Sequence, residues 1–148
     1  MAGAFKLALS QFAAKAGDRA DQVVRQVTLD VAGRIIARSP VGNPSNWKRP
    51  APPGYVGGRF RANWRIGVGG PATGTTEMID PDGGATNGAI AAALPAKAAG
   101  TVLYLTNNLP YAWALEHGHS KQRPNGMVGL TVLEFAAIVD KAAGGLAP

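Results

Sequence analysis

Five prolines and four glycines fall within residues 40–58, and this density constrains the fold more than any other feature of the chain. Proline fixes φ and removes a backbone donor, and glycine is conformationally permissive, so neither a helix nor a sheet strand is expected to run through this stretch. We predict an extended loop or arm over residues 41–58. A long segment without regular structure inside a compact domain is usually functional, so we interpret it as a contact arm that becomes ordered against a neighbouring subunit.

Length and composition set the class of protein. The 148 residues amount to about one domain with one core, so we treat 1–148 as a single domain. The absence of cysteine excludes a disulfide framework and a thiolate metal site. Neither a secretion signal near Met1 nor an apolar run of roughly 20 residues is present, so we expect a cytoplasmic, soluble chain with no membrane contact.

Helical periodicity dominates the N-terminal part. Apolar residues recur at helical spacing before Gly17, which predicts a short helical segment over residues 1–17 with the glycine at its end; they are Phe5, Leu9, Phe12 and Ala16. A second, amphipathic helix is predicted from Asp18 to about Arg38, where Ser39-Pro40 stops it, and its apolar stripe comprises Val24, Val27, Val31 and Ile35.

The rest of the chain alternates between strand and helix signals. Period-2 alternation predicts a strand over residues 60–68, with Trp64 and Ile66 in the core. Segment 70–100 is interpreted as an insertion, with a brief strand at 75–79, a turn formed by Asp80 and Asp82, and a short helix within 87–97. Further elements follow: a strand at 101–106, a helical turn at 111–117, and a last helix that ends at Gly144-Gly145 and has an apolar stripe of Val128, Val132, Phe135 and Val139. The predicted class is α+β, a small antiparallel β-sheet packed by a long N-terminal helix and a C-terminal helix, with the extended Pro/Gly-rich arm.

The charge distribution is uneven. The net charge is +6, and no acidic residue occurs between Asp30 and Glu77. Seven cations occupy that interval: Arg34, Arg38, Lys48, Arg49, Arg59, Arg61 and Arg65. We interpret them first as a solvated basic face; because Trp47, Tyr55, Phe60 and Trp64 alternate with them, contact with nucleic acid by stacking stays open.

No residue pattern predicts catalysis. Glu116-His117-Gly118-His119 is the densest polar cluster, but adjacent residues point in different directions and a zinc site needs three or four converging ligands. None of the serines lies in a nucleophile elbow, and the glycines at 67–70 lack the lysine of a phosphate-binding loop. We therefore expect neither an enzyme nor a bound cofactor or metal.

Three stretches resemble the minor tail-component family of siphophages, which includes neck and tail-completion proteins. Ala37-Arg38-Ser39-Pro40-Val41 after a long helix, followed by the segment 58–64, is similar to the family's helix and "P-V-x-T-G-x-L-R-x-S" start. Asn107 to Ala112 with Leu115-Glu116-His117-Gly118 resembles its "N-x-x-P-Y-A-x-x-x-E-x-G" signature. Residues 122–128 resemble the "P-x-G-M-V" stretch that precedes its last helix, although the family's short "V-D-T-G" link is replaced here by the arm at 41–58.

The resemblance covers about residues 18–139 and implies a sheet with packed helices, in a protein that sits at the head-tail junction of the virion as a homo-oligomeric, six-fold ring. The implied partners are other neck and tail proteins, such as head-closure, tail-tube or terminator proteins, after assembly in the host cytoplasm. In this interpretation Pro110, Tyr111, Glu116 and Gly118 are structural determinants, with Glu116 accepting backbone or arginine hydrogen bonds that hold its loop.

The sequence therefore favours an assembly protein. The candidate residues for contact with a subunit, another partner or the ring lumen are Trp47, Lys48, Arg49, Tyr55, Arg59, Arg61 and Arg65. A tail terminator that caps the tail tube is the nearest alternative. A sequence-independent DNA-binding protein that uses Arg59, Arg61 and Arg65 is the alternative from another class, and a metallohydrolase built on Glu116, His117 and His119 comes third.

Overall fold

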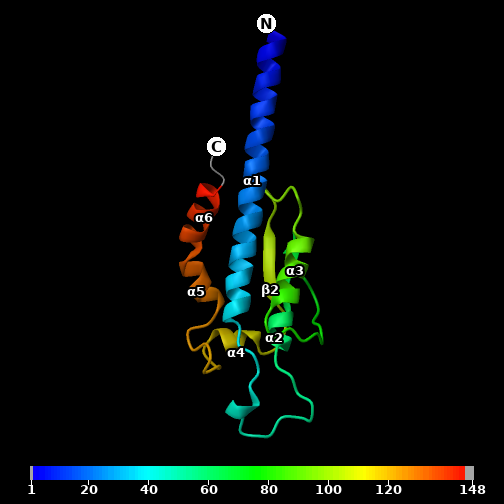
Figure 1. Ribbon diagram of the computed structural model, residues 1–148, viewed down its shortest axis with the longest axis vertical. Helices are drawn as coiled ribbons and strands as arrows, with labels where there is room; N and C mark the ends of the chain where they lie inside the picture. Colours follow the sequence, from blue (N-terminus) through cyan, green and yellow to red (C-terminus); the bar gives the residue numbers. More distant parts are fainter. Residues whose placement is uncertain (1, 146–148) are drawn as a thin grey trace.

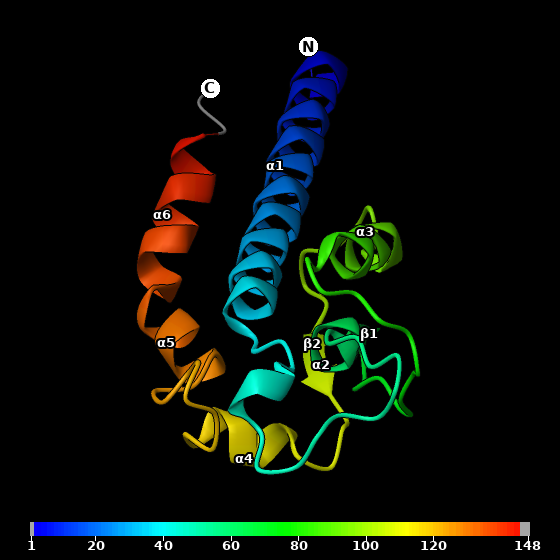
Figure 2. The ribbon, with the colours of Figure 1, turned by 60° about the horizontal axis from the view of Figure 1, so that its bottom comes forward.

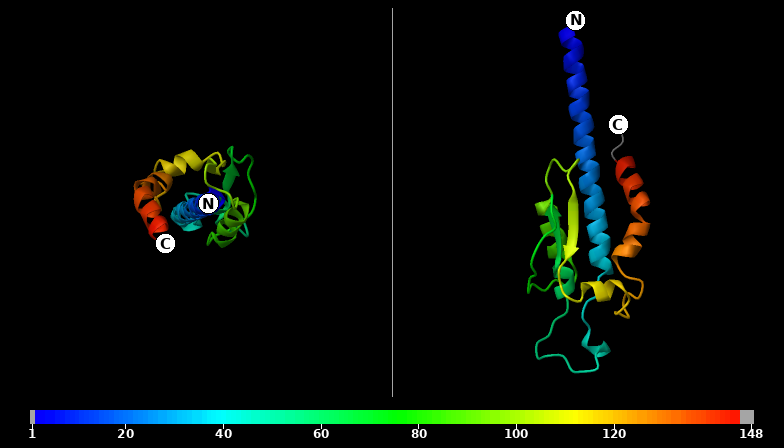
Figure 3. Two further views of the ribbon diagram at one scale, coloured as in Figure 1. Left: turned by 90° about the horizontal axis from the view of Figure 1, so that it is seen from above. Right: turned by 180° about the vertical axis from the view of Figure 1, so that it is seen from behind.

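One long helix organises the molecule. The computed structural model describes the backbone of residues 2–145 and the side chains of residues 15–145. Helix α1 (Ala2–Arg38) spans 37 residues, which at 1.5 Å per residue is about 55 Å. Its N-terminal half projects beyond the other described elements (Figures 1 and 3). On one side of its C-terminal half lie α5 (Val128–Leu133) and α6 (Phe135–Gly144), and on the other side lies the sheet with α3 (Gly84–Ala93).

The prediction that a helix ends at Gly17 is wrong, because α1 continues through it. A C-terminal glycine cap requires a positive φ, which Gly17 does not have. The alanine-rich sequence before Gly17 has a high helix propensity, which offsets the low propensity of this one glycine. The side chains of Phe5, Leu9 and Phe12, which the predicted first stripe contains, lie outside the described ones.

The sheet has two antiparallel strands, β1 (Trp64–Val68) and β2 (Leu103–Asn107). The register places Trp64 opposite Asn107 and Val68 opposite Leu103. Figure 2 shows the sheet beside α1, with α3 against it. The predicted strand at 101–106 is thus confirmed with a shift of one or two residues, and the predicted α+β class holds.

The predicted strand at 60–68 is right only in its second half. Helix α2 (Arg59–Ala62) replaces its start, because Gly58 adopts φ 120° and its carbonyl accepts the Ala62 amide at 3.1 Å. Phe60 and Trp64, which also fit a period of four, meet edge to face with ring centroids 5.9 Å apart. The alternating apolar residues of 60–68 therefore belong to two elements, the helical turn α2 and the strand β1.

No strand forms at 75–79, contrary to prediction. The Thr76 backbone is instead held by the side chain of Asn63, whose Oδ1 accepts the Thr76 amide at 2.9 Å and whose Nδ2 donates to the Thr76 carbonyl at 3.0 Å. A side chain that takes both backbone groups competes with ladder pairing. The segment is extended without a strand partner.

Helix α3 (Gly84–Ala93) confirms the predicted helix of the insertion but begins earlier. Buried Asp80 caps this helix, because its carboxylate accepts the Gly83 amide at 3.2 Å and both the amide and the hydroxyl of Thr86, at 2.7 and 2.6 Å. These bonds, working against burial, lower the pKa of Asp80 below its usual value. The helix ends before Pro95, as a pre-proline position favours.

The C-terminal part contains α4 (Ala112–Glu116), α5 (Val128–Leu133) and α6 (Phe135–Gly144). The predicted helical turn at 111–117 and the end at Gly144 are confirmed. The predicted apolar stripe is right for Val128, which is half-buried against the core, and for half-buried Val139, but it is wrong for Val132 and Phe135, which are 63% and 51% exposed. The face turned toward α1 instead carries Met127, Thr131, Glu134, Ile138 and Ala142.

The core lies where α1, α2, β1, α3 and the loop before α5 meet. Its buried members are Ala32, Ile35, Ile36, Phe60, Trp64, Ile90, Leu109 and Met127. Trp64 is a core residue as predicted, and Ile66 is half-buried against this cluster. The Trp64 indole donates to Ser39 Oγ at 2.7 Å, which ties the sheet to the end of α1.

Candidate interaction site

The Pro/Gly segment forms a loop with a closed base. Apart from one turn of 3-10 helix at Pro44–Asn46 it has no regular structure, as predicted. A Cβ added at Gly57 would lie 2.3 Å from the Gly42 carbonyl oxygen, and one added at Gly42 would lie 2.0 Å from the Tyr55 hydroxyl. The chain segments that enter and leave the loop are therefore in direct contact, as in an Ω-loop, and a side chain does not fit at Gly57, where the nearest atom belongs to the backbone.

Gln122 fastens this loop to the segment after α4. Its side-chain oxygen accepts the Val41 amide at 3.2 Å and its amide donates to the Val41 carbonyl at 2.8 Å. Arg123 adds a bond from Nε to the Arg38 carbonyl at 2.6 Å. The loop and the 118–123 segment are thus held side by side at the end of α1.

A cavity of about 520 Å³ opens between these two segments and α4. Its aromatic and aliphatic lining comes from the loop, α2, α4 and the turn before α4, and comprises Pro40, Val41, Trp47, Tyr55, Phe60, Tyr111 and Leu115. The polar lining includes Arg59, His119, Ser120 and Lys121. The volume falls within the range typical of ligand or side-chain pockets, about 300 to 1,000 Å³.

Two of the predicted contact residues form the outer edge of this cavity. Trp47 and Tyr55 meet at a ring-centroid distance of 4.8 Å and an angle of 61°, and both stay partly exposed. Lys48 and Arg49 follow in the same loop and are exposed. The structure therefore brings the aromatic pair to the cavity and leaves these two cations on the loop surface.

The three other predicted contact residues make contacts within the chain. Arg61 donates to the Ser39, Ala37 and Pro81 carbonyls at 2.9, 2.9 and 2.6 Å, so it closes the C-terminal end of α1. Burial, helped by the charge of Arg123, lowers the pKa of Arg61. Arg65 donates to the Thr73 carbonyl at 3.0 Å.

Arg59 lies at the cavity and is held more loosely. Its Nε donates to the Thr76 carbonyl at 3.3 Å, and its Nη2 contacts Glu77 at 2.6 Å. The Glu77 side chain is 86% exposed, and ion pairs of this kind contribute about 0 to 1 kcal/mol. Arg59 can therefore exchange the Glu77 carboxylate for another one at low cost.

The motif residues have structural roles. The Glu116 carboxylate accepts three backbone N–H groups at the start of α5, from Met127, Val128 and Gly129, at 2.9, 3.0 and 2.8 Å. Burial alone would raise the pKa of Glu116, but the bonds from Gly129, Val128 and Met127 outweigh it and lower that pKa. The expectation that Glu116 accepts backbone hydrogen bonds is confirmed.

The same sequence motif contains three further residues, Pro110, Tyr111 and Gly118. Gly118 adopts φ 90°, and a Cβ there would lie 2.8 Å from the Pro124 carbonyl oxygen, so glycine is required. Pro110 is exposed in the turn before α4. The Tyr111 ring lies 6.0 Å from that of Phe60 and also lines the cavity, and burial raises the pKa of its hydroxyl.

The histidines do not form a metal site with Glu116. His117 stacks on Trp113 at 3.9 Å, and its Nδ1 lies 2.8 Å from the Trp113 carbonyl, whereas His119 faces the cavity. Across the residues that the structure describes, no three His, Asp or Glu side chains gather as metal ligands would. The Glu116 oxygens already accept three backbone amides at the start of α5. The metallohydrolase hypothesis needed this carboxylate as a metal ligand.

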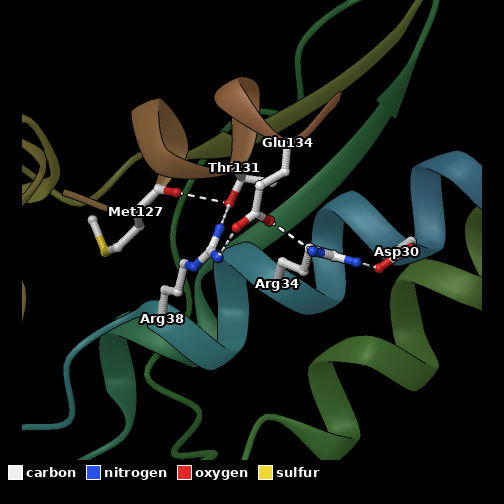
Figure 4. A network of polar contacts seen from close by, with 6 residues as sticks. All are labelled: Asp30, Arg34, Arg38, Met127, Thr131 and Glu134. Atoms are coloured by element: carbon white, nitrogen blue, oxygen red, sulfur yellow. Dashed lines mark hydrogen bonds and ion pairs between the residues drawn. The ribbon is translucent and has the colours of Figure 1, made fainter. Parts of the chain in front are cut away.

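Sequence reasoning missed a charged network between α1 and the α5–α6 junction (Figure 4). Glu134 accepts Arg34 Nη1 at 2.7 Å and also binds Arg38, while Arg34 Nε reaches Asp30 at 2.8 Å. Arg38 Nη1 donates to Thr131 Oγ1 at 2.8 Å, and that hydroxyl donates to the Met127 carbonyl. The i, i+4 spacing of Asp30, Arg34 and Arg38 was the available signal.

Because of this network, large apolar side chains of α5 and α6 face the solvent. Glu134 points to α1, so its neighbours Val132, Leu133 and Phe135 are 63%, 83% and 51% exposed. Trp113 on α4 is 72% exposed as well. Surfaces of this kind are typical of sites where another protein binds.

Comparison of the chain with protein-family models, with curated proteins and with solved structures found no match. Within the described part of the chain, no helix combines the length and the apolar character that crossing a bilayer requires.

Proposed function

We propose that the chain is a structural virion protein of a tailed bacteriophage, a neck or tail-completion component that forms a homo-oligomeric ring at the head-tail interface. The observation that carries the proposal is the outward-facing apolar surface on α5 and α6, because the network at Glu134 holds those side chains away from the core. A chain that uses ion pairs to keep Leu133 and Phe135 outside is suited to assembly.

The bonding between motif segments supports this proposal. The segments that carry the resemblance contact one another in pairs: Trp64 and Arg61 bind Ser39, and Glu116 binds the start of α5. These residues fix the geometry of the fold rather than supply a reactive group. That is the role a shared assembly fold requires of its motif.

Contact with DNA ranks below this proposal. Nucleic-acid binding without sequence preference needs several cations free to neutralise phosphates. Arg61 and Arg65 donate to backbone carbonyls of their own chain, and Arg59 contacts Glu77. Lys48 and Arg49 are the exposed cations of the loop, and contact with DNA in a ring lumen would depend on them.

Cryo-electron microscopy of the intact particle tests the proposal. We expect density for residues 18–139 as a ring between the portal and the tail tube. A ring that directly caps the end of the tube would favour the tail terminator instead. Absence of the chain from the particle would overturn both interpretations, and binding to DNA at low salt with a steep salt dependence would then move the DNA-binding alternative to the front.

A further inference from the structure

The cavity beside the Pro/Gly loop has a one-sided electrostatic character. Arg59, Lys121 and the titratable His119 line it, and among the described residues that form its lining there is no Asp or Glu. Lys121 is exposed, and Lys48 and Arg49 lie on the adjoining loop. Such a site favours an anionic group, since a carboxylate entering it meets donors from the lining, and the nearby carboxylate of Glu77 is itself bound to Arg59 through an exposed ion pair.

The remaining lining favours an apolar group next to that anion. Trp47, Tyr55 and Tyr111 present their rings at the cavity, above the more buried Phe60 and Leu115. Trp, Tyr and Arg are the residue types enriched where one protein anchors a side chain of another. A purely ionic ligand would leave this aromatic surface unused.

The site is built before any ligand arrives. The closed base at Gly42 and Gly57 fixes the loop, and Gln122 holds its first residue to the 118–123 segment. Binding therefore requires little ordering of the backbone, which is the main cost for a flexible loop. When a ligand binds, Arg59 exchanges the exposed carboxylate of Glu77 for the carboxylate of the ligand.

We propose that this cavity binds a segment of a neighbouring protein in which an acidic side chain lies next to an apolar or aromatic one. The proposal deepens the proposed function, on which it rests for the presence of neighbouring proteins. The carboxylate lies between Arg59 and Lys121, and the apolar side chain contacts Trp47, Tyr55 and Tyr111. Peptide is favoured over nucleic acid because Arg59 and Lys121 are the Lys and Arg side chains among the described residues of the lining, and two cations do not form a track along which a phosphate backbone can lie.

A displayed library of random twelve-residue peptides, selected against the full-length protein, tests this directly. We expect enrichment of sequences that pair Asp or Glu with an adjacent Leu, Ile, Phe or Trp. The best peptide is then synthesised with its matched Asp→Asn or Glu→Gln twin, and both are titrated by calorimetry. Loss of the carboxylate is expected to weaken binding about tenfold or more, since a hydrogen bond to a charged group is lost.

Matched variants locate the binding. Trp47→Ala and Lys121→Gln are each expected to weaken the selected peptide about tenfold. Tyr104→Ala and Lys141→Gln remove an aromatic ring and a cation at exposed positions outside the cavity lining and should leave binding unchanged. The melting temperatures of all four variants, compared with that of the unmodified protein, test whether each variant keeps the fold.

The proposal is overturned if selection gives no acidic consensus, if the twin peptides bind alike, or if Tyr104→Ala and Lys141→Gln weaken binding as much as the cavity variants. It is also overturned if a ten-residue thymidine oligonucleotide displaces the peptide and loses affinity in Lys121→Gln. The ring in the particle is a separate readout. A ring without peptide binding leaves the proposed function standing and removes this inference alone.

Discussion

At the scale of single residues, Glu116 has a larger structural effect than its exposed surroundings suggest. Its carboxylate is eleven residues from Met127 in sequence, yet it accepts the first amides of α5. Those amides have no partner within the helix itself, and a negative charge there is favourable toward the helix dipole. One side chain thereby positions the helix that carries the outward apolar surface.

Replacing Glu116 by Gln is expected to lower the free energy of unfolding by about 1 to 3 kcal/mol, because one oxygen that accepts amides becomes an NH₂ group. Urea denaturation followed by circular dichroism measures the change. Asp140→Asn removes the same charge from an exposed position of α6 and should cost less than about 0.5 kcal/mol. Equal effects of the two substitutions would contradict the role given to Glu116.

The pH dependence of stability follows from the same class of residue. The pKa values of Asp80, Glu116 and Glu134 are all lowered in the folded protein. Their stabilising contribution is therefore complete above the ordinary carboxyl values of 3.8 and 4.5 and is lost as the pH falls through the lowered folded values. Thermal melts from pH 7 to pH 2 should show a flat region and then a decline below about pH 4.5.

The decline should be shallower in Asp80→Asn, since this variant no longer titrates at the start of α3. It should begin from a lower melting temperature at pH 7, because the bonds to Gly83 and Thr86 are weakened. A melting temperature that rose as the pH fell from 5 to 3 would contradict the lowered pKa values of these carboxylates.

At the scale of whole elements, α1 shows how a local signal can mislead. Gly17 is helical, and nothing lies within 4 Å of a Cβ added there. Gly17→Ala is therefore expected to stabilise the helix by about 0.5 to 1 kcal/mol and to raise helicity in far-ultraviolet circular dichroism. If Gly17 were a helix cap with positive φ, alanine would destabilise instead.

Gly83→Ala is the matched contrast. Gly83 has φ 82°, and an added Cβ would lie 2.4 Å from Cγ2 of Ile36 in the core. The same chemical change should thus destabilise the protein here. Opposite signs at the two positions, measured by denaturation, would establish that the local backbone and not the residue type decides the outcome.

Several elements were predictable because their signals are local. Pro40 ends α1, the repeated Pro and Gly residues exclude regular structure from the loop, and Val102 to Leu105 resembles a strand. The candidate contact residues Trp47 and Tyr55 were predicted from their alternation with cations in the Pro/Gly segment. The cavity that they edge was not, because His119, Lys121 and Gln122 reach it only through the fold.

The face of the last helices was assigned wrongly for a physical reason. A hydrophobic pattern assumes that the larger apolar side chains are buried, and it selected Val132 and Phe135. Glu134 instead turns inward because Arg34 and Arg38 on α1 supply two partners for its carboxylate. The i, i+4 spacing of charges on α1 shows that Arg34 and Arg38 share a face, but it does not identify a partner a hundred residues away, as Glu134 is from Arg34.

At the scale of the whole molecule, the outward surface on α5 and α6 should matter for assembly and not for folding. Leu133→Lys is expected to change the free energy of unfolding by less than about 0.5 kcal/mol, since the side chain is 83% exposed. It should nevertheless reduce oligomer formation, measured by native mass spectrometry, and incorporation into particles.

Ala92→Lys provides the control for the added charge, because Ala92 is exposed on α3. This variant should assemble normally. Rings that form equally well with Leu133→Lys would show that subunits meet through another surface.

The loop at residues 43–56 has a closed base and lies at the end of the molecule opposite the N-terminus of α1 (Figure 1). Gly42 and Gly57 are in contact at the base of this loop, and its tip between Pro53 and Gly54 is exposed. We therefore expect a sequence inserted at the tip to leave the core undisturbed. A small folded tag placed there would act as a landmark in low-resolution images. In images of the proposed ring, the position of the tag would show which way each subunit points before any side chain is visible.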